Sequence, residues 1–222
     1  MSSYIKKLIA QGEHQRLDFK FEISDSKKIA RTLAAFSNTD GGKLLVGVKD
    51  NGAIAGVRSE EEFYMVEAAA QMYCRPPVEF ATREWNVDGK TILEIDIPKS
   101  DNGPCSAPDK EGKWMIYIRV YDQNLLANTV LLKVWQLQNR KKGITIRYTD
   151  KEKILLEYLD KNGNITLSKF RKIAGISHQV AEKVLVDLIT LQVIQMDITE
   201  KSVFYLINPD LKTDPLSELT VR

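Results

Sequence analysis

The sequence predicts an α+β fold followed by a second, smaller domain. Between residues 24 and 57, an amphipathic helix, a glycine turn, an apolar strand and a hairpin signal follow one another. Alternating strand patterns and further helices extend this first region to residue 138. From residue 150 onwards, three helical segments and a two-stranded hairpin replace that pattern. We therefore expect a mixed sheet with helices, and then a compact helical domain with a β-wing.

The segment from 24 to 57 is the expected centre of the fold. Ile29, Leu33 and Phe36 recur at helical spacing, so they form one apolar stripe behind the capping candidates of residues 24–26. A turn with two glycines ends this helix, because glycine adopts backbone conformations that other residues avoid. Residues 44–48 then read as a strand buried on both faces, and Asn51-Gly52 predicts a hairpin.

The other elements of the first domain are predicted from the same two patterns, the helical spacing of apolar residues and the alternation of a strand. Residues 17–21 alternate apolar and polar side chains, which predicts a strand with one polar face. Two consecutive prolines at 76 and 77 end the helix that begins at residue 59. The full expectation adds helices over 4–11, 59–74 and 129–138, and strands over 78–85, 90–97 and 114–120.

Composition narrows the functional classes. The chain of 222 residues has a formal net charge of +2, so a nucleic-acid surface must come from local clustering of its 32 Lys and Arg residues. Cys74 and Cys105 have no metal-binding spacing and form no disulfide framework, so we expect buried, reduced thiols. The chain has no apolar run long enough for a signal peptide or a membrane span, which favours a cytoplasmic location and no membrane partner.

A family resemblance rests on a series of motifs in a fixed order. The segment AAFSNTDGGKLLVGVKDNGAIAGV, the upstream EHQRLDFK, and the later IPKS and YIR lie between residues 13 and 119. Together they resemble the Schlafen-type AlbA-like domain, found in many bacterial proteins described as transcriptional regulators. The resemblance implies an AlbA-like mixed sheet and a nucleic-acid-binding role over roughly residues 10–130.

Three acidic residues are the sharpest chemical candidates. The resemblance to Schlafen nucleases implies that Glu13, Asp18 and Asp50 hold Mg²⁺ or Mn²⁺ for RNA cleavage, since hard cations prefer oxygen ligands. Position 18 carries Asp where the family usually has Glu, which shortens its reach. The alternative is that these acids are solvated, or that Asp18 pairs with Lys20 or Arg31.

A set of basic side chains in the first domain is the candidate nucleic-acid face. Lysine and arginine neutralise phosphates and release counterions without reading bases. A lysine-rich helix face can also be merely solvated. Gly41-Gly42-Lys43 lacks the P-loop pattern and is expected to be a turn rather than a nucleotide site. The basic candidates are Lys20, Lys27, Lys28, Arg31 and Arg119.

The C-terminal region predicts a winged helix. Helices are expected over 150–160, 167–174 and 177–191, with a two-stranded wing over 193–196 and 203–207. The turn through Gly175 to Ser177 resembles that of a helix-turn-helix. We expect domains over 1–138 and 150–208, separated by a basic linker over 139–149 and followed by a disordered tail over 209–222.

The second and third helices of this region carry the candidate DNA contacts. Gln179 could read adenine, and Lys183 could contact a phosphate or guanine. Glu182 and Asp187 fall on the same predicted face and oppose DNA binding, so protein binding or dimer packing is the alternative. The candidate contacts are Lys169, Arg171, Lys172, His178, Gln179 and Lys183.

The sequence thus favours a DNA-binding transcriptional regulator over an enzyme. A metal-dependent endoribonuclease is the first alternative, and a protein-interaction module without a nucleic-acid role is the second. No cofactor is expected apart from Mg²⁺ or Mn²⁺ under the ribonuclease alternative. The partner is DNA or RNA. The resemblance also implies a homodimer, because the Schlafen nucleases carry two related lobes in one chain and this chain has one copy of the central motif, so a comparable cleft would need a second chain.

Overall fold

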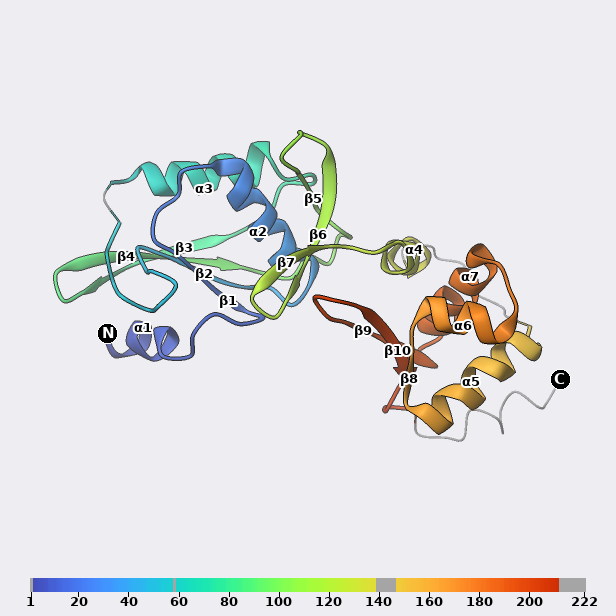
Figure 1. Ribbon diagram of the computed structural model, residues 1–222. Helices are drawn as coiled ribbons and strands as arrows, with labels where there is room; N and C mark the ends of the chain where they lie inside the picture. Colours follow the sequence, from blue (N-terminus) through green and yellow to red (C-terminus); the bar gives the residue numbers. More distant parts are fainter. Residues whose placement is uncertain (1, 58, 139–146, 212–222) are drawn as a thin grey trace. The chain divides into compact units, whose positions relative to one another are not determined.

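The computed structural model describes residues 2–57, 59–138 and 147–211 (Figure 1). The chain divides into two compact units, Met1–Ala127 and Asn128–Arg222. No helix in the described ranges is both long and apolar enough to cross a bilayer. Most of the expected linker and tail, residues 139–146 and 212–222, lies outside the described residues.

The expected end of the first domain at residue 138 differs from the division in the structure. Helix α4 (Thr129–Gln138) forms as predicted, but it packs against α7 (His178–Thr190) of the second unit. Val130 and Val134 are buried in the core of that unit. Helical periodicity predicts the apolar stripe of α4 but not which domain buries it, which accounts for the difference.

A four-stranded mixed sheet forms the centre of the first unit. Its strand order is β1-β2-β4-β3, with β1 parallel to β2 and the other neighbours antiparallel. The predicted mixed α+β character is therefore confirmed. The strands are β1 (Leu17–Lys20), β2 (Gly42–Val46), β3 (Ala81–Val87) and β4 (Lys90–Ile97).

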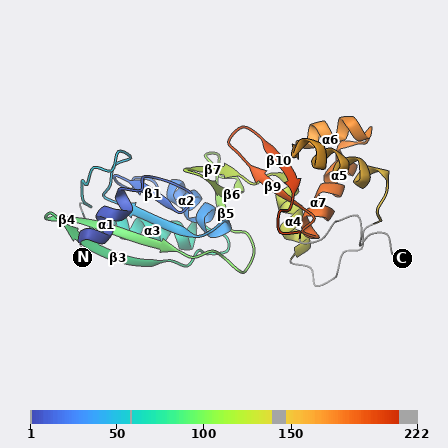
Figure 2. The same cartoon turned by 90° about the horizontal axis from the view of Figure 1, so that it is seen from below.

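Helices cover both faces of this sheet. Figure 1 shows α2 (Ser26–Asn38) and α3 (Glu61–Met72) on one face and α1 (Ser2–Ile9) on the other. The view from below shows α1 crossing in front of the strands (Figure 2). Leu44 and Ile95 enter the core with α2 and α3, whereas Phe19, Leu45 and Ile92 form a second core with α1. This alternation follows from the two-residue period of a strand.

Helix α2 occupies the predicted central position. Asp25 caps it by accepting hydrogen bonds from the N–H groups of Lys27 and Lys28, at 2.8 and 3.3 Å. At its other end the two-glycine turn is required by close packing. A Cβ on Gly41 would lie 2.7 Å from the Ile97 carbonyl oxygen, and one on Gly42 would lie 2.5 Å from the Phe36 ring. The predicted two-glycine turn is therefore present, and it has glycines because larger residues would collide with α2 and β4.

A smaller sheet packs against α2. It contains β5 (Ser106–Pro108), β6 (Trp114–Val120) and β7 (Gln123–Leu126) in that order. The Asn38 amide at the end of α2 donates to the carbonyls of Cys105 and Tyr117, both at 2.8 Å, and accepts from the Cys105 N–H at 2.7 Å. Cys74 and Cys105 are buried and unbridged, as expected. The hairpin predicted after Asn51 is reduced to an isolated Val48–Ile54 bridge.

A buried carboxylate attaches α1 to the sheet. Glu94 accepts hydrogen bonds from the Tyr4 hydroxyl at 2.8 Å and the Trp85 indole N–H at 2.6 Å, and Lys43 Nζ lies 2.9 Å away. Burial alone would raise the pKa of Glu94, but Lys43, Tyr4 and Trp85 outweigh it and lower this pKa. The carboxylate is therefore held in its charged form beneath α1.

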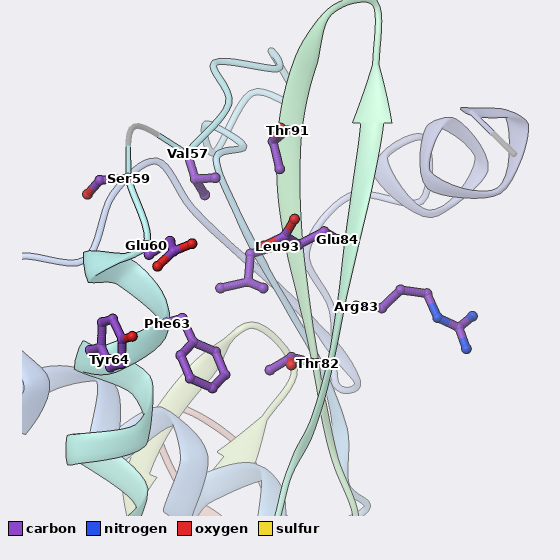
Figure 3. Close-up of a pocket in the computed structure, with 10 residues that line it drawn as sticks. All are labelled: Val57, Ser59, Glu60, Phe63, Tyr64, Thr82, Arg83, Glu84, Thr91 and Leu93. Carbon is purple, nitrogen blue, oxygen red and sulfur yellow. The ribbon is translucent and has the colours of Figure 1, made fainter.

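Strand β3 is an edge of the four-stranded sheet. On one face of it, a groove of about 640 Å³ lies between β3, β4 and the first turn of α3 (Figure 3). We call this the β3 groove; its residues are Val57, Ser59, Glu60, Phe63, Tyr64, Thr82, Arg83, Glu84, Thr91 and Leu93.

Within its described residues, the second unit combines four helices with a three-stranded sheet of order β8-β10-β9. Gly175 takes a left-handed conformation (φ 63°) after α6, and Ser177 then caps α7 by accepting from the Val180 N–H at 3.3 Å. The predicted helices and hairpin form here, with β8 added. The bounds are α5 (Asp150–Asn162), β8 (Asn164–Ile165), α6 (Leu167–Ala174), β9 (Ile194–Ile198) and β10 (Val203–Ile207).

Candidate nucleic-acid interface

A basic groove lies along the first turns of α2. Its volume is about 910 Å³, and we call it the α2 groove. Three of the predicted basic residues, Lys27, Lys28 and Arg31, line it together with Lys110 from the β5–β6 connection. The opposite wall comes from α3 and the residue that follows it. The remaining lining residues are Ser24, Asp25, Ser26, Met65, Ala68, Met72, Tyr73 and Asp109.

The two acids of the α2 groove are bound to backbone groups. Asp25 caps α2, and Asp109 accepts hydrogen bonds from the N–H groups of Glu111 and Lys113 at 2.9 and 2.8 Å. Neither forms an ion pair with a lysine among the described residues, and Lys27, Lys28 and Lys110 are exposed and have no ion-pair partner there. Free surface cations are the groups that neutralise phosphates.

The groove also offers aromatic and apolar surface. Lys27 Nζ lies 5.7 Å from the centre of the Tyr73 ring, and the Met72 side chain is 66% exposed. Arg31 is half-buried, and its Nε donates to the Pro108 carbonyl at 2.8 Å, which fixes the guanidinium beside the groove. Cations next to an accessible ring suit a sugar-phosphate chain with unstacked bases.

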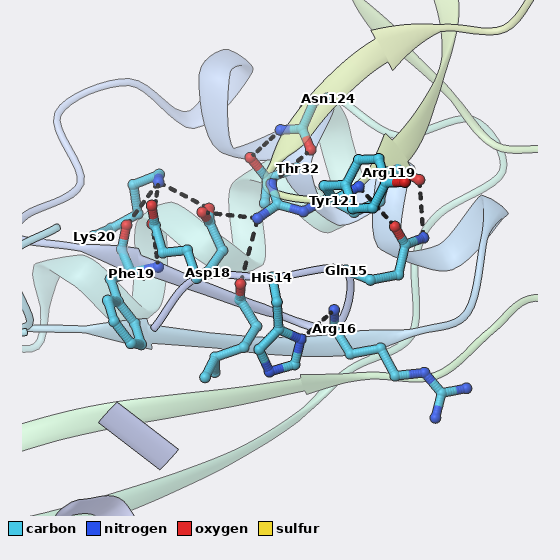
Figure 4. A network of polar contacts seen from close by, with 12 residues as sticks. His14, Gln15, Arg16, Asp18, Phe19, Lys20, Thr32, Arg119, Tyr121 and Asn124 are labelled. Atoms are coloured by element: carbon cyan, nitrogen blue, oxygen red, sulfur yellow. Dashed lines mark hydrogen bonds and ion pairs between the residues drawn. The ribbon is translucent and has the colours of Figure 1, made fainter. Parts of the chain in front are cut away.

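Arg119 does not belong to this surface, and its predicted phosphate contact is wrong. Arg119 belongs to β6, and its side chain is 1% exposed and faces Asp18 of β1 (Figure 4). Its Nη2 donates to Asp18 Oδ1 at 3.1 Å and its Nη1 to Asn124 Oδ1 at 3.1 Å. The guanidinium also lies 5.0 Å from the Phe36 ring centre. Arg119 is therefore an interior ion-pair partner, because Asp18 needs a buried counter-charge.

Lys20 is likewise paired with the buried Asp18, while its own side chain is 26% exposed. Its Nζ lies 2.8 Å from Asp18 Oδ2, an ion pair whose angle does not make a hydrogen bond, and it donates to the Phe19 carbonyl at 2.6 Å. Glu13 Oε1 is 3.9 Å from the same Nζ. The structure thus confirms the alternative in which Asp18 pairs with Lys20, and it separates Lys20 from the free cations of the α2 groove.

The three predicted acids do not form a cation site as they lie. Glu13 accepts from the Phe19 N–H at 2.9 Å, and burial together with the neighbouring Asp18 carboxylate raises the pKa of Glu13. Asp18 is 3% exposed and already faces Lys20 and Arg119. Asp50 is exposed, and within the described ranges no three acidic, His or Cys side chains are grouped to hold a metal. The donor set does not fit a divalent cation, because two side-chain cations already occupy its charges.

Residues that the sequence did not single out complete this network. Gln15 donates to the Arg119 carbonyl at 2.9 Å and accepts from the Tyr121 N–H at 2.8 Å, so it joins the β1 region to the end of β6. Asn124, which accepts from Arg119, also donates from its Nδ2 to Thr32 Oγ1 of α2 at 2.9 Å. Gln15 lies within the EHQRLDFK segment and Asn124 in β7, but their partners are distant in the chain, so only the tertiary structure identifies their roles.

In the second unit, the predicted DNA contacts all lie on exposed positions. Those of α6 precede the Gly175 turn, and those of α7 follow it within the first two turns of the helix. Lys183 Nζ forms an ion pair with Asp187 Oδ2 at 2.6 Å. Lys169 Nζ lies 6.0 Å from the centre of the Tyr158 ring. The exposed set is Lys169, Arg171, Lys172, His178, Gln179 and Lys183.

The acids that opposed DNA binding are turned away or neutralised. Glu182 was expected on the solvent face, but it is 4% exposed and pairs with Lys133 of α4. Burial alone would raise the pKa of Glu182, and Lys133 outweighs this and lowers it. Asp187 is matched by Lys183 on the same helix. The exposed face around the α6–α7 turn is therefore basic.

Comparison with known proteins agrees with the motif order. A family model described as "Schlafen, AlbA_2" matches residues 13–128. No curated protein matches the chain. Solved structures that resemble it include the DIP2311 protein from Corynebacterium diphtheriae, with 18% identity, a TM-score of 0.41, and coverage of 68% of this chain and 31% of that protein. Another is the N-terminal domain of a RecG-related protein from Nitrosomonas europaea, with 17% identity, a TM-score of 0.35, and coverage of 65% and 97%.

The interior role of Arg119 predicts a large effect on stability. Arg119→Met leaves the buried Asp18 with Lys20 alone, so we expect the free energy of unfolding to fall by about 3 kcal/mol in urea denaturation. Replacing both partners, with Asp18→Leu and Arg119→Met, should cost less than the sum of the two single changes. An Arg119→Met protein of undiminished stability that binds nucleic acid more weakly would instead make Arg119 a surface contact.

Proposed function

Since the chain belongs to the Schlafen AlbA_2 family, we propose that it is a nucleic-acid-binding protein that acts as a DNA-binding transcriptional regulator. The observation that carries this proposal is the exposed basic face around the α6–α7 turn, from which Glu182 is withdrawn. A helix–glycine turn–helix with lysine, arginine and glutamine on the outside has the residues that contact phosphates and bases.

The second unit is assigned as a winged helix under this proposal. The order α5, β8, α6, α7, β9 and β10 supports the assignment, since three helices precede a β-hairpin. Helix α7 would enter the major groove with Gln179 near its start, and the α6 residues Lys169, Arg171 and Lys172 would contact the backbone. The side-chain amide of Gln179 can form two hydrogen bonds with one adenine, at its N6 and N7 atoms.

The α2 groove is assigned to sequence-tolerant phosphate binding. Its free lysines come from two separate parts of the chain, α2 and the β5–β6 connection, and they line one groove, in which Lys27 Nζ lies 5.7 Å from the Tyr73 ring centre. No base-reading pattern is needed for such a surface, because phosphate contacts position a nucleic acid without specifying its sequence. The two units then divide affinity and sequence reading between them.

A homodimer fits this division of labour. A twofold dimer is the commonest assembly of soluble proteins, and it would present two α7 helices to the half-sites of a palindromic operator. Each chain contributes one α2 groove and one α6–α7 face. Half-sites separated by about one or more helical turns of DNA are then expected.

The α2 groove assignment predicts the effect of charge reversal. Lys27→Glu with Lys28→Glu should weaken binding to all nucleic-acid sequences by about tenfold or more at low salt, and should flatten the salt dependence, because each lost phosphate contact removes roughly 0.9 from the slope. Fluorescence anisotropy with labelled DNA over a series of salt concentrations measures both.

A matched control separates this contact from net charge. Lys7→Glu with Lys99→Glu reverses two exposed lysines outside the α2 groove and changes the net charge equally. This control should retain most of the wild-type affinity and salt slope. If both double variants lost the same affinity, the loss would be due to overall charge, and the α2 groove would not be part of the interface.

The base-reading role of α7 predicts a loss of specificity. With an operator selected from random duplexes, Gln179→Ala should lose about 1–3 kcal/mol of discrimination at one base pair while binding to unrelated DNA stays nearly constant. Gln71→Ala, at an exposed position of α3, is the control and should leave discrimination intact. Unchanged discrimination in Gln179→Ala would contradict base reading at this position.

A further inference from the structure

The outer edge of β3 has free backbone groups in a regular pattern. Within the described residues β3 pairs with β4 alone, and Ala81 to Glu84 and Asn86 are exposed. The two-residue turn Asp88-Gly89, with φ of 53° and 77°, makes Val87 and Lys90 a hydrogen-bonded pair. Because such pairs alternate along an antiparallel ladder, the N–H and C=O groups of Thr82, Glu84 and Asn86 point away from β4.

The opposite side of β4 supports this assignment. Val57 donates its N–H to the Thr91 carbonyl at 2.7 Å. Thr91 is the residue opposite Asn86, so its backbone groups are directed away from β3. The N–H and C=O groups of Asn86 therefore lie on the free edge of β3. This agrees with the alternation of hydrogen-bonded pairs that starts at Val87 and Lys90.

Two of these edge residues have side chains that face the β3 groove. Thr82 and Glu84 line it together with an apolar floor of Val57, Phe63 and Leu93 (Figure 3). Tyr64 stands at the rim with 59% of its surface exposed. The groove volume of about 640 Å³ is enough for apolar side chains of a bound molecule.

Two carboxylates belong to the described lining of the β3 groove. Glu60 and Glu84 line it, and neither has an ion-pair partner among the described residues. Arg83 points away from the groove in Figure 3, and its guanidinium lies 5.4 Å from the Trp85 ring centre. The groove therefore combines an apolar floor with carboxylates that favour a cationic ligand.

We propose that the β3 edge binds an extended segment of a partner protein as an added fifth strand of the sheet. An apolar side chain of that segment would occupy the β3 groove, and lysine or arginine at the alternate flanking positions would face Glu60 and Glu84. Backbone hydrogen bonds give affinity in this mode of recognition, and the pocket for alternate side chains gives specificity.

A second copy of the chain is the poorer occupant. Paired antiparallel with itself, β3 would present Thr82, Glu84 and Asn86 on the groove face, and none of these fills an apolar floor. Glu84 of each copy would also enter a region that is already acidic, which like-charge repulsion disfavours. Charge and shape both favour a basic, apolar segment of another protein.

A synthetic peptide tests the proposal on the full chain. The probe is a dye-labelled seven-residue peptide that places lysine, leucine, lysine and lysine on alternate positions, with threonine between them. We expect saturable binding by fluorescence anisotropy. Methylating the amide nitrogens that face β3 should weaken binding by about tenfold, whereas methylating the other amides should have little effect, because only the first set donates to the added edge.

Charge variants test the groove with a matched control. Glu60→Lys with Glu84→Lys should weaken peptide binding by about tenfold or more. Glu111→Lys with Glu200→Lys makes the same charge change at exposed sites outside the β3 groove and should bind the peptide normally. Equal losses in both double variants would show a diffuse charge effect and overturn the proposal.

Amide hydrogen exchange distinguishes strand addition from other binding. The amides of Thr82, Glu84 and Asn86 should exchange rapidly in the free protein and become protected when the peptide is added. Absence of peptide binding up to millimolar concentration, or binding without this alternating protection, would overturn the proposal. Protection of the same amides that increases with protein concentration alone would assign the edge to a second copy and would also overturn it.

Discussion

Arg119 and Asp18 place opposite charges in the interior of the first unit, and each depends on the other because an unpaired buried charge is costly. The pair connects β1 of the main sheet to β6 of the smaller sheet, and Asn124 and Thr32 extend the connection to α2. Helix α2 is in turn fixed against β2 by the two-glycine turn, where a Cβ would collide with Phe36 or the Ile97 carbonyl. The position of α2, and with it the α2 groove, follows from these contacts.

This arrangement separates charges that hold the fold from charges that are free to bind. The charge of Asp18 is paired with Lys20 and Arg119, and these three side chains belong to no group that could hold a metal among the described residues. Lys27, Lys28 and Lys110 are exposed and line the α2 groove, where Lys27 lies near the Tyr73 ring. The second unit shows the same division, because Lys133 withdraws Glu182 into the interior and leaves the α6–α7 face basic.

Local patterns predicted much of the fold. The apolar stripe of α2, the glycine turn, the strand β6 and the helices α6 and α7 are visible in the sequence because each depends on near neighbours. The burial of Arg119, the role of Gln15 and the withdrawal of Glu182 were not predictable, since each depends on a partner far away in the chain. The short strands β5, β7 and β8 were missed for the same reason, as pairing rather than periodicity defines them. The family resemblance suggested three acids for one site, but burial and ion pairing decide which side chains are available.

The central claim is that nucleic acid contacts the α2 groove and the α6–α7 face, while the acids near β1 serve the fold. Mapping of backbone amide chemical shifts in the full chain, with duplex DNA and with single-stranded RNA and in the presence and absence of Mg²⁺, tests this claim most directly. We predict nucleic-acid-dependent shifts around Lys27, Tyr73 and Gln179, and no Mg²⁺-dependent shifts at Glu13 or Asp18. Mg²⁺-dependent shifts at Glu13, Asp18 and Asp50 together with cleavage of the RNA would contradict it.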